Sequence, residues 1–237
     1  MLITGAARRV GAQMARVLHS AGANIMIHYR SSAAAAIALA DSLNAVRPHS
    51  AAIHAALLLE PEAPEKVVAA ALLEFGRLDV LINNASSFYP TPVGSITGPQ
   101  WDDLIGSNLK APLFLSQAAA PSLKARRGLI INMVDIHGLR PLKEHPVYCA
   151  AKAGLVMLTK SLARELGPEI RVNAIAPGPV LWPEAHMDDS VKRDIIDKTA
   201  LKRPGSPQDI ARTALFLAAD APYITGQIIA VDGGRSI

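Results

Sequence analysis

Short runs of apolar and β-branched residues alternate along the chain with longer amphipathic stretches. Seven of these runs are apolar at consecutive positions, which is typical of strands buried on both faces. The predicted strands cover residues 1–4, 24–29, 51–55, 80–83, 129–133, 171–176 and 227–231. Helical periodicity lies between them, near residues 10–21, 33–45, 62–75, 101–124, 147–167 and 207–219.

This alternation predicts an α/β protein with a single domain over residues 1–237. Strands that are apolar on both faces need helices on both sides, so the expected fold is a Rossmann-type, doubly wound parallel sheet. Ligands bind such sheets at the carboxyl ends of the strands. The first strand is short because Thr4 and Gly5 already begin a turn, so we expect the natural chain to carry a few more residues before it.

Composition narrows the class of protein. The chain of 237 residues is 50% hydrophobic and has one cysteine, Cys149, which excludes disorder, a disulfide scaffold and a cysteine-rich metal site. The seven histidines show no metal-ligand spacing, so no metal is expected. The net charge of +4 is spread without a basic block, which predicts no nucleic-acid partner. No secretion signal and no run of about 18 apolar residues occurs, so we expect a soluble, cytoplasmic protein without membrane contact.

A candidate phosphate site follows the first strand. In the segment Thr4-Gly5-Ala6-Ala7-Arg8-Arg9-Val10-Gly11, Gly5 permits a tight turn and Gly11 permits close packing of helix and strand. The backbone N–H groups of such a turn and the helix N-terminus attract a pyrophosphate. An ordinary strand-to-helix turn is the plainer interpretation, but its place after the first strand favours dinucleotide binding.

The end of the second strand indicates which dinucleotide is bound. An acidic residue there accepts the ribose 2′-hydroxyl of NADH, yet no acid occurs before Asp41. The sequence at this point is His28-Tyr29-Arg30-Ser31-Ser32. Arg30 suits a 2′-phosphate through charge-assisted hydrogen bonds, so NADPH is the expected cofactor. The alternative is that Arg30 is a solvated loop charge.

Candidate acid–base residues begin the helix after the fifth strand. Tyr148 and Lys152 are four residues apart and therefore share one helix face. A nearby ammonium is expected to lower the pKa of a phenol, which is otherwise about 10. Asn108 stands inside a helical pattern, where asparagine is disfavoured.

Taken together, these motifs resemble the short-chain dehydrogenase/reductase family. The resemblance rests on the turn at 4–11, Asn83-Asn84-Ala85, Asn108, the Tyr148/Lys152 pair and Pro177-Gly178, and it extends to the ending Val231-Asp232-Gly233-Gly234. It implies that Tyr148 donates a proton, that Lys152 binds the nicotinamide ribose, and that Asn108 helps to hold a relay water. It also implies a homotetramer. The cofactor-binding residues that it implies are Gly5, Arg9, Val10, His28, Tyr29, Arg30, Ser31, Asn84, Ala85, Ser86, Lys152, Pro177 and Gly178.

Departures from the usual family pattern point to one branch. Arg9 and Ser86 stand where the family usually has glycine, and Asp135 stands where it usually has serine. These three residues are similar to those of the pteridine reductase branch, as are the strings 83–92 and 132–135 and the ending 232–236. Leu57 replaces an aspartate that usually contacts adenine, and it matches neither pattern.

The substituted residues suit a flat pterin better than a carbonyl. An ionised carboxylate would repel the oxyanion of a reduced carbonyl, whereas a carboxyl paired with Tyr148 can relay a proton to a ring nitrogen if burial raises its pKa. The resemblance implies a substrate site of Arg9, Ser86, Phe88, Asp135, Tyr148 and Trp182, with Phe88 stacked on the pterin. The plainer alternatives are a core-capping Phe88, a turn-capping Asp135, a surface charge at Arg9 and a Trp182 that only packs under the substrate lid, about residues 177–200.

The sequence thus predicts NADPH-dependent reduction of a dihydropterin, of dihydrobiopterin, dihydromonapterin or dihydrofolate type. Two alternatives stay open. One is an NADPH-dependent carbonyl reductase of the same family, acting on a 3-oxoacyl or sugar substrate. The other is a non-catalytic NADPH-binding sensor.

Overall fold

A parallel sheet with helices on both faces forms the body of the protein in the computed structural model, which describes residues 1–182 and 187–237. Within these residues, seven strands pair in the order β3-β2-β1-β4-β5-β6-β7, every pair parallel. The strands are β1 Leu2–Ile3, β2 Ile25–Tyr29, β3 Ala51–Ala55, β4 Val80–Asn83, β5 Leu129–Met133, β6 Arg171–Pro177 and β7 Ile228–Val231. The predicted doubly wound α/β fold is confirmed, and the strand ends differ from prediction by two residues or fewer.

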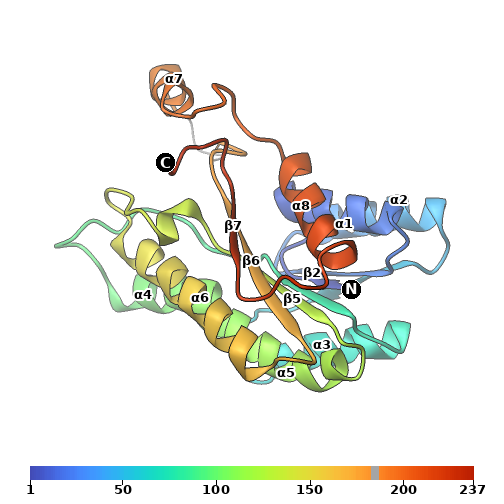
Figure 1. Ribbon diagram of the computed structural model, residues 1–237. Coiled ribbons are helices and arrows are strands. Elements are labelled where there is room, and N and C mark those ends of the chain that lie inside the picture. The colour runs from blue at the N-terminus through green and yellow to red at the C-terminus, as the bar shows by residue number, and fades with distance from the viewer. Residues whose placement is uncertain (183–186) are drawn as a thin grey trace.

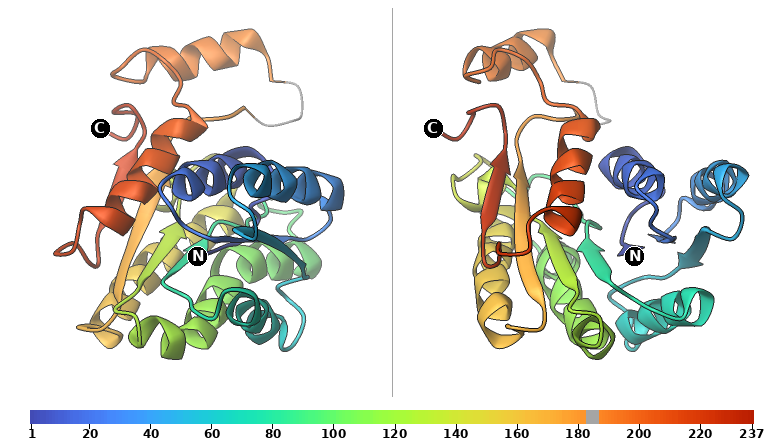
Figure 2. Two further views of the ribbon diagram at one scale, coloured as in Figure 1. Left: turned by 90° about the vertical axis from the view of Figure 1, so that its right-hand side faces the viewer. Right: turned by 45° about the vertical axis from the view of Figure 1, so that its right-hand side comes forward.

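Two layers of helices cover the sheet (Figure 1). One layer holds α1 Arg9–Ser20, α2 Ala33–Val46 and α8 Pro207–Ala219. The other holds α3 Ala63–Phe75, α4 Gly98–Ile105, α5 Ala111–Lys124 and α6 Pro146–Glu165. A further helix, α7 Asp189–Asp197, has no buried residue and stands off the body of the fold (Figure 2).

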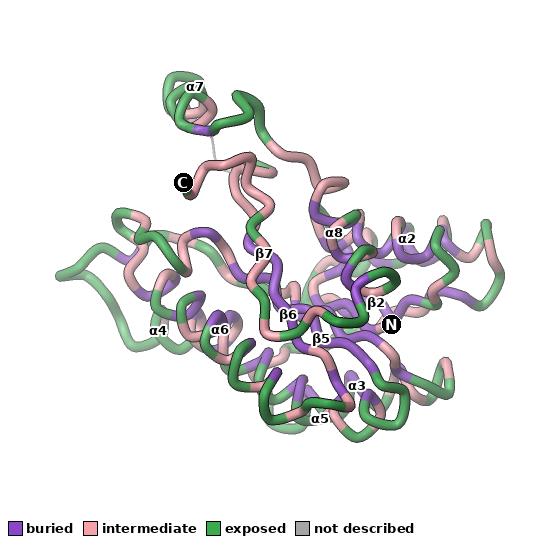
Figure 3. The backbone as a smooth tube through the Cα atoms, in the orientation of Figure 1, coloured by how far each residue is buried: buried purple, intermediate pink, exposed green. Residues whose placement is uncertain are grey.

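Alternating side chains of the strands explain why their sequences are apolar throughout. Ile3 and Ile27 belong to the core cluster on the α1/α8 side. Leu2 and Met26, their sequence neighbours, belong to the cluster on the α3/α5 side. β1 and β2 therefore bury both faces, and the buried residues concentrate along the sheet (Figure 3). No helix among the described residues has the length and apolarity that crossing a membrane requires.

One predicted helix is wrong in detail. The pattern at 101–124 predicts a single helix, but α4 ends at Ile105 and a π-helical turn, η1, spans Gly106–Lys110 before α5 begins. Pro112 lacks the N–H that an α-helix would donate to the carbonyl of Asn108, four residues earlier. The turn is further held by Asn108 Nδ2, which donates to Leu104 O at 3.0 Å. Such π turns are frequent at functional sites.

Strand order reverses direction between β1 and β4, and this reversal positions the site. Chain segments leaving β1 and β4 diverge to opposite sides of the sheet, which opens a crevice at their carboxyl ends. The loop after β5 and the start of α6 flank this crevice. Of the predicted lid, residues 183–186 lie outside the described residues.

Candidate active site

The turn after β1 is built by close approach of backbone segments. Gly5 has φ +60°, and a Cβ there would lie 2.9 Å from Ala85 Cα. A Cβ on Gly11 would lie 2.5 Å from Gly5 O. Asn84 Nδ2 donates to Thr4 O at 2.9 Å and Gly5 O at 3.0 Å, which ties the β4 loop to the turn. Both glycines are thus required by geometry.

His28 supports the same turn from β2. Its buried ring accepts a hydrogen bond from Gly5 N at Nδ1, 3.2 Å, and Nε2 contacts Ala56 O at 3.0 Å. These partners assign the proton of the neutral ring to Nε2. Burial lowers the pKa of His28 to about 4, so the ring stays neutral and positions the turn without adding charge.

A cavity of about 390 Å³ runs from this turn along the ends of β2, β3 and β4. Ten of the predicted cofactor residues line it: Gly5, Arg9, Val10, His28, Tyr29, Arg30, Ser31, Asn84, Ala85 and Ser86. The remaining three, Lys152, Pro177 and Gly178, do not line it. Pro177 ends β6, and Gly178 N donates to Val231 O at 3.1 Å beside the end of β7.

The residues of this cavity fit a phosphorylated dinucleotide. Gly5 and Gly11 leave room for phosphate against the backbone, at the N-terminus of α1. Arg30 and Ser31 lie at the end of β2, where a ribose phosphate would be held, and no carboxylate lies among residues 28–32. Leu57 also lines the cavity and offers adenine an apolar contact without a hydrogen bond.

Asp135 and Tyr148 form the central polar contact beyond this cavity. The Tyr148 hydroxyl donates to Asp135 Oδ2 at 2.8 Å, and His137 N donates to Asp135 Oδ1 at 2.8 Å. Asp135 follows β5 and caps the short 3₁₀ helix η2, Ile136–Gly138. The turn-capping interpretation and the pairing with Tyr148 therefore both hold, because each uses a different carboxylate oxygen.

The shift of the Tyr148 pKa differs from expectation. Burial, with the Asp135 carboxylate beside the hydroxyl, raises the pKa of Tyr148 well above its usual range. The predicted net lowering is wrong, because burial and the Asp135 carboxylate dominate the shift, although the Lys152 ammonium lies 5.6 Å from the centroid of the Tyr148 ring. Tyr148 is consequently a protonated hydrogen-bond donor at neutral pH.

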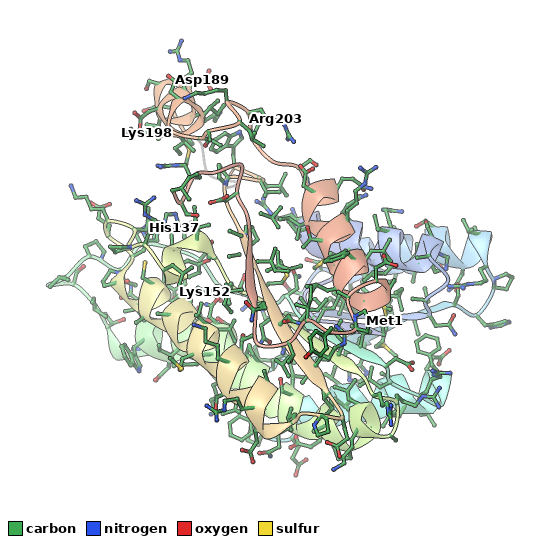
Figure 4. All side chains as sticks on the ribbon, in the orientation of Figure 1. Met1, His137, Lys152, Asp189, Lys198 and Arg203 are labelled. Atoms are coloured by element: carbon green, nitrogen blue, oxygen red, sulfur yellow. The ribbon has the colours of Figure 1, made fainter. Side chains whose placement is uncertain are left out.

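Lys152 is buried and extends from α6 (Figure 4). It lies four residues after Tyr148 and therefore on the same face of that helix. Its Nζ donates to Met133 O at the end of β5, 2.8 Å away. Burial lowers the pKa of Lys152 to about 8, and the Asp135 carboxylate opposes that shift. The side chain therefore places a titratable cation near the Asp135–Tyr148 pair, with Nζ 5.6 Å from the centroid of the Tyr148 ring.

Asn108 lies in the π turn η1 and faces the loop after β4. Its Nδ2 donates to Ser87 O at 2.9 Å, besides the bond to Leu104. Its Oδ1 is buried and has no hydrogen-bond partner among the described residues. A buried acceptor of this kind suits an additional donor, which agrees with the water-holding role that the resemblance implies.

The predicted substrate residues make two separate sets of contacts, one at Phe88 and one at Arg9. The Phe88 ring meets Tyr148 edge to face, with centroids 4.8 Å apart. Phe88 is 47% exposed, so it does not cap the core. Arg9 Nη2 donates to Trp182 O at 3.1 Å, which joins the turn after β1 to the start of the predicted lid. Ser86 is exposed at the cavity wall.

Several residues at the site were not predicted from the sequence. Asp103 and Ser107 line the cavity from α4 and η1, and the Ser107 hydroxyl donates to Asp103 O at 2.7 Å. His145, at the N-cap of α6, stacks on Phe88. The one sequence signal that could have placed His145 at the site is its spacing of three residues from Tyr148.

Comparison with known proteins adds the family context. A family model described as enoyl-(acyl carrier protein) reductase matches residues 5–236. Pteridine reductase 1 of Leishmania tarentolae is 39% identical, with 100% of this chain and 96% of that protein covered. A 3-oxoacyl-[acyl-carrier-protein] reductase of Staphylococcus epidermidis is 38% identical, with 98% and 97% covered. A 7alpha-hydroxysteroid dehydrogenase of Bacteroides fragilis is 35% identical, with 100% and 94% covered.

Proposed function

Because this chain belongs to the short-chain dehydrogenase/reductase family, we propose that it reduces a dihydropterin to the tetrahydropterin. The chain is an oxidoreductase that acts on a small molecule, and its cofactor is NADPH. The choice of a pterin is carried by one observation, the hydrogen bond from the Tyr148 hydroxyl to Asp135 Oδ2 at 2.8 Å.

This bond suits proton delivery to a ring nitrogen. When bound, NADPH supplies a hydride to a ring carbon of the substrate. The adjacent ring nitrogen then needs a proton, and the Tyr148 hydroxyl is a donor kept protonated by its raised pKa. After Tyr148 has given up this proton, its phenol oxygen recovers one from water, and the Asp135 carboxyl, 2.8 Å away, relays it.

Lys152 and Asn108 support this transfer. A tyrosinate that forms transiently lies near the Lys152 ammonium, which stabilises the negative charge. The buried Oδ1 of Asn108 is an acceptor for a water that resupplies the proton. Phe88, half exposed beside Tyr148, offers a flat ring a stacking surface.

A carbonyl reductase of the same family is the second candidate. It is favoured by the 38% identity to a 3-oxoacyl-[acyl-carrier-protein] reductase, which nearly equals the identity to pteridine reductase 1. Asp135 weighs against it, because a carboxylate beside the phenol repels a developing alkoxide. A non-catalytic sensor would have no use for the Asp135–Tyr148 pair.

The test is NADPH oxidation, followed by absorbance, with dihydrobiopterin, dihydromonapterin, dihydrofolate, a 3-oxoacyl thioester and simple ketones. We expect kcat/KM to be highest for one of the dihydropterins. A clear preference for the thioester or a ketone would favour the carbonyl reductase. Tight NADPH binding without turnover of any compound would favour the sensor.

Replacing Arg30 with alanine is expected to raise the KM for NADPH by about 10-fold to 100-fold, the scale of lost bonds to a charged group. The KM for NADH should hardly change, since NADH has no 2′-phosphate. Steady-state kinetics with both cofactors measure this. Arg212→Ala, at an exposed arginine of α8 outside the cavity, is the matched control. A wild-type preference for NADH would contradict the assignment.

The affinity for NADPH should depend on the charge of Lys152. Its pKa of about 8 means that the ammonium is present below pH 8 and is lost as the pH rises through that value. Binding of the anionic cofactor should therefore weaken by up to about tenfold between pH 7 and pH 9. Fluorescence titration across this range measures the dissociation constant, and Lys152→Met should flatten the curve. A flat wild-type curve would exclude this role of Lys152.

The proposal includes assembly of several copies of the chain into an oligomer. Exposed apolar side chains on the α4, α5 and α6 surfaces, namely Trp101, Leu113, Phe114 and Met157, support a homotetramer formed through the stretches 101–124 and 147–167.

The segment about 177–200 is proposed to close over the substrate. The bond between Arg9 and Trp182 O supports this, because it ties the first part of that segment to the cofactor turn.

A further inference from the structure

His145 is the aromatic neighbour of Phe88 that the mechanism above does not use. Its imidazole lies parallel to the Phe88 ring, with centroids 4.8 Å apart and an interplanar angle of 14°. Phe88 also meets Tyr148 edge to face at 4.8 Å. Because His145 and Tyr148 are three residues apart at the start of α6, one helical turn holds both contacts.

Both partners of this stack are tied to their surroundings. The His145 Nδ1 contacts Lys143 O at 2.8 Å, and the His145 carbonyl accepts a bond from Cys149 N at 3.0 Å in the first turn of α6. The loop that carries Phe88 is joined to the same region, since Thr91 N donates to Glu144 O at 2.6 Å. The two rings are thus held together by bonds on either side of the contact.

The stack decides which face of Phe88 a substrate can use. Two rings with centroids 4.8 Å apart are in direct contact, so no third ring fits between them. Phe88 is nevertheless 47% exposed. With one face covered by His145, a flat heterocycle must stack on the opposite face.

We propose that His145 is a positioning residue that backs Phe88 and fixes the plane against which the substrate ring stacks. This rests on the proposed function, because it needs a flat substrate at Phe88. The imidazole itself does not touch the reacting atoms. Its loss should therefore weaken substrate binding while leaving the proton transfer from Tyr148 intact.

Three substitutions separate the possible roles of this ring. His145→Phe keeps a flat ring but removes the bond to Lys143 O. His145→Leu keeps much of the volume but removes the flat ring, and His145→Ala removes both. Calorimetry with 7,8-dihydrobiopterin and enzyme loaded with NADP⁺ measures substrate binding without turnover, and steady-state kinetics separate KM from kcat.

We expect the dissociation constant and the KM for dihydrobiopterin to rise about 3- to 10-fold in His145→Ala and His145→Leu, the scale of a lost aromatic pair. In His145→Phe both values should stay near wild type. The kcat and the KM for NADPH should change little in all three variants. This pattern requires a ring, not merely a side chain of suitable size.

Two other results would overturn the proposal. Unchanged binding in all three variants would show that Phe88 needs no backing ring, and equal weakening in all three, His145→Phe included, would assign the effect to the Lys143 bond. In both cases the wild-type enzyme still binds and reduces dihydrobiopterin, so the proposed function stands. A wild-type enzyme that neither binds nor reduces any of the three dihydropterins would refute the proposed function and the role of His145 together.

Discussion

Replacing Tyr148 with phenylalanine should lower kcat for dihydropterin reduction by about 10³-fold, within the range expected for a lost general acid. The change removes one oxygen atom and keeps the ring that meets Phe88 edge to face. Substrate stacking and NADPH binding should therefore stay near wild type. The loss should appear in kcat and not in KM, because the removed group acts as the proton is transferred.

The folded state should tolerate this substitution. The phenylalanine leaves Asp135 Oδ2 without the donor that Tyr148 supplied at 2.8 Å, which costs about 1–3 kcal/mol for a buried acceptor. Asp135 is only partly buried, so water can replace the donor and the cost should fall at the lower end. Thermal unfolding of both proteins, with single-turnover rates at saturating NADPH, separates lost chemistry from lost stability.

A variant that retains more than a tenth of the wild-type kcat would contradict the role of Tyr148 as proton donor. The proton would then come from another group or from water. Phe88→Leu is the matched control, because it removes the stacking ring and leaves the Tyr148 hydroxyl in place. It should raise the KM for the pterin with a much smaller effect on kcat.

Local pattern was enough to predict the sheet. Apolar runs such as 80–83 and 129–133 have the bounds of β4 and β5, since a strand buried on both faces leaves a continuous hydrophobic signal. Glycine spacing likewise located the turn at Gly5, because its positive φ requires a residue without a side chain.

The helix at 101–124 shows where local pattern fails. Its periodicity is compatible with one uninterrupted helix, and the π turn arises from contacts made in the folded chain. Asn108 bonds to Ser87 O, and Gly106 lies against the Leu59 side chain. Neither partner is near in sequence. The sequence held two local signs of the turn, Asn108 inside a helical pattern and Pro112 four residues later.

Electrostatics at the site could not be predicted from residue types. The spacing of four residues between Tyr148 and Lys152 predicted a lowered pKa for the Tyr148 phenol. The sequence does not reveal how deeply the two side chains are buried. Burial raises the pKa of Tyr148 and lowers that of Lys152. The partner chosen by each group, Asp135 for the phenol and Met133 O for the ammonium, depends on the tertiary fold.

Replacing Asp135 with serine should slow dihydropterin reduction by about 10²-fold, the scale of a lost acid–base group. A serine hydroxyl still forms a hydrogen bond near Tyr148, but it cannot carry the proton that the phenol oxygen must recover. The same change removes the negative charge that opposes an alkoxide. Reduction of ketones or of a 3-oxoacyl thioester should therefore be unchanged or faster.

Asp135→Asn is the matched control for shape. The amide is nearly isosteric, and its carbonyl oxygen can accept a bond from the Tyr148 hydroxyl or from His137 N, the two donors to Asp135. It neither ionises nor carries an acidic proton, so pterin reduction should fall about as far as in the serine variant. Without the carboxylate, the pKa of Tyr148 should also decrease, because Asp135 is one cause of its elevation.

The two variants together separate a proton relay from a structural cap. If Asp135 only caps η2 through His137 N, the asparagine variant should keep nearly full activity with pterins. If Asp135 relays the proton, both variants lose pterin reduction while the affinity for NADPH stays unchanged. Wild-type rates in both variants would remove the reason for preferring a pterin over a carbonyl substrate, because no other contact of Asp135 in the described structure distinguishes the two chemistries.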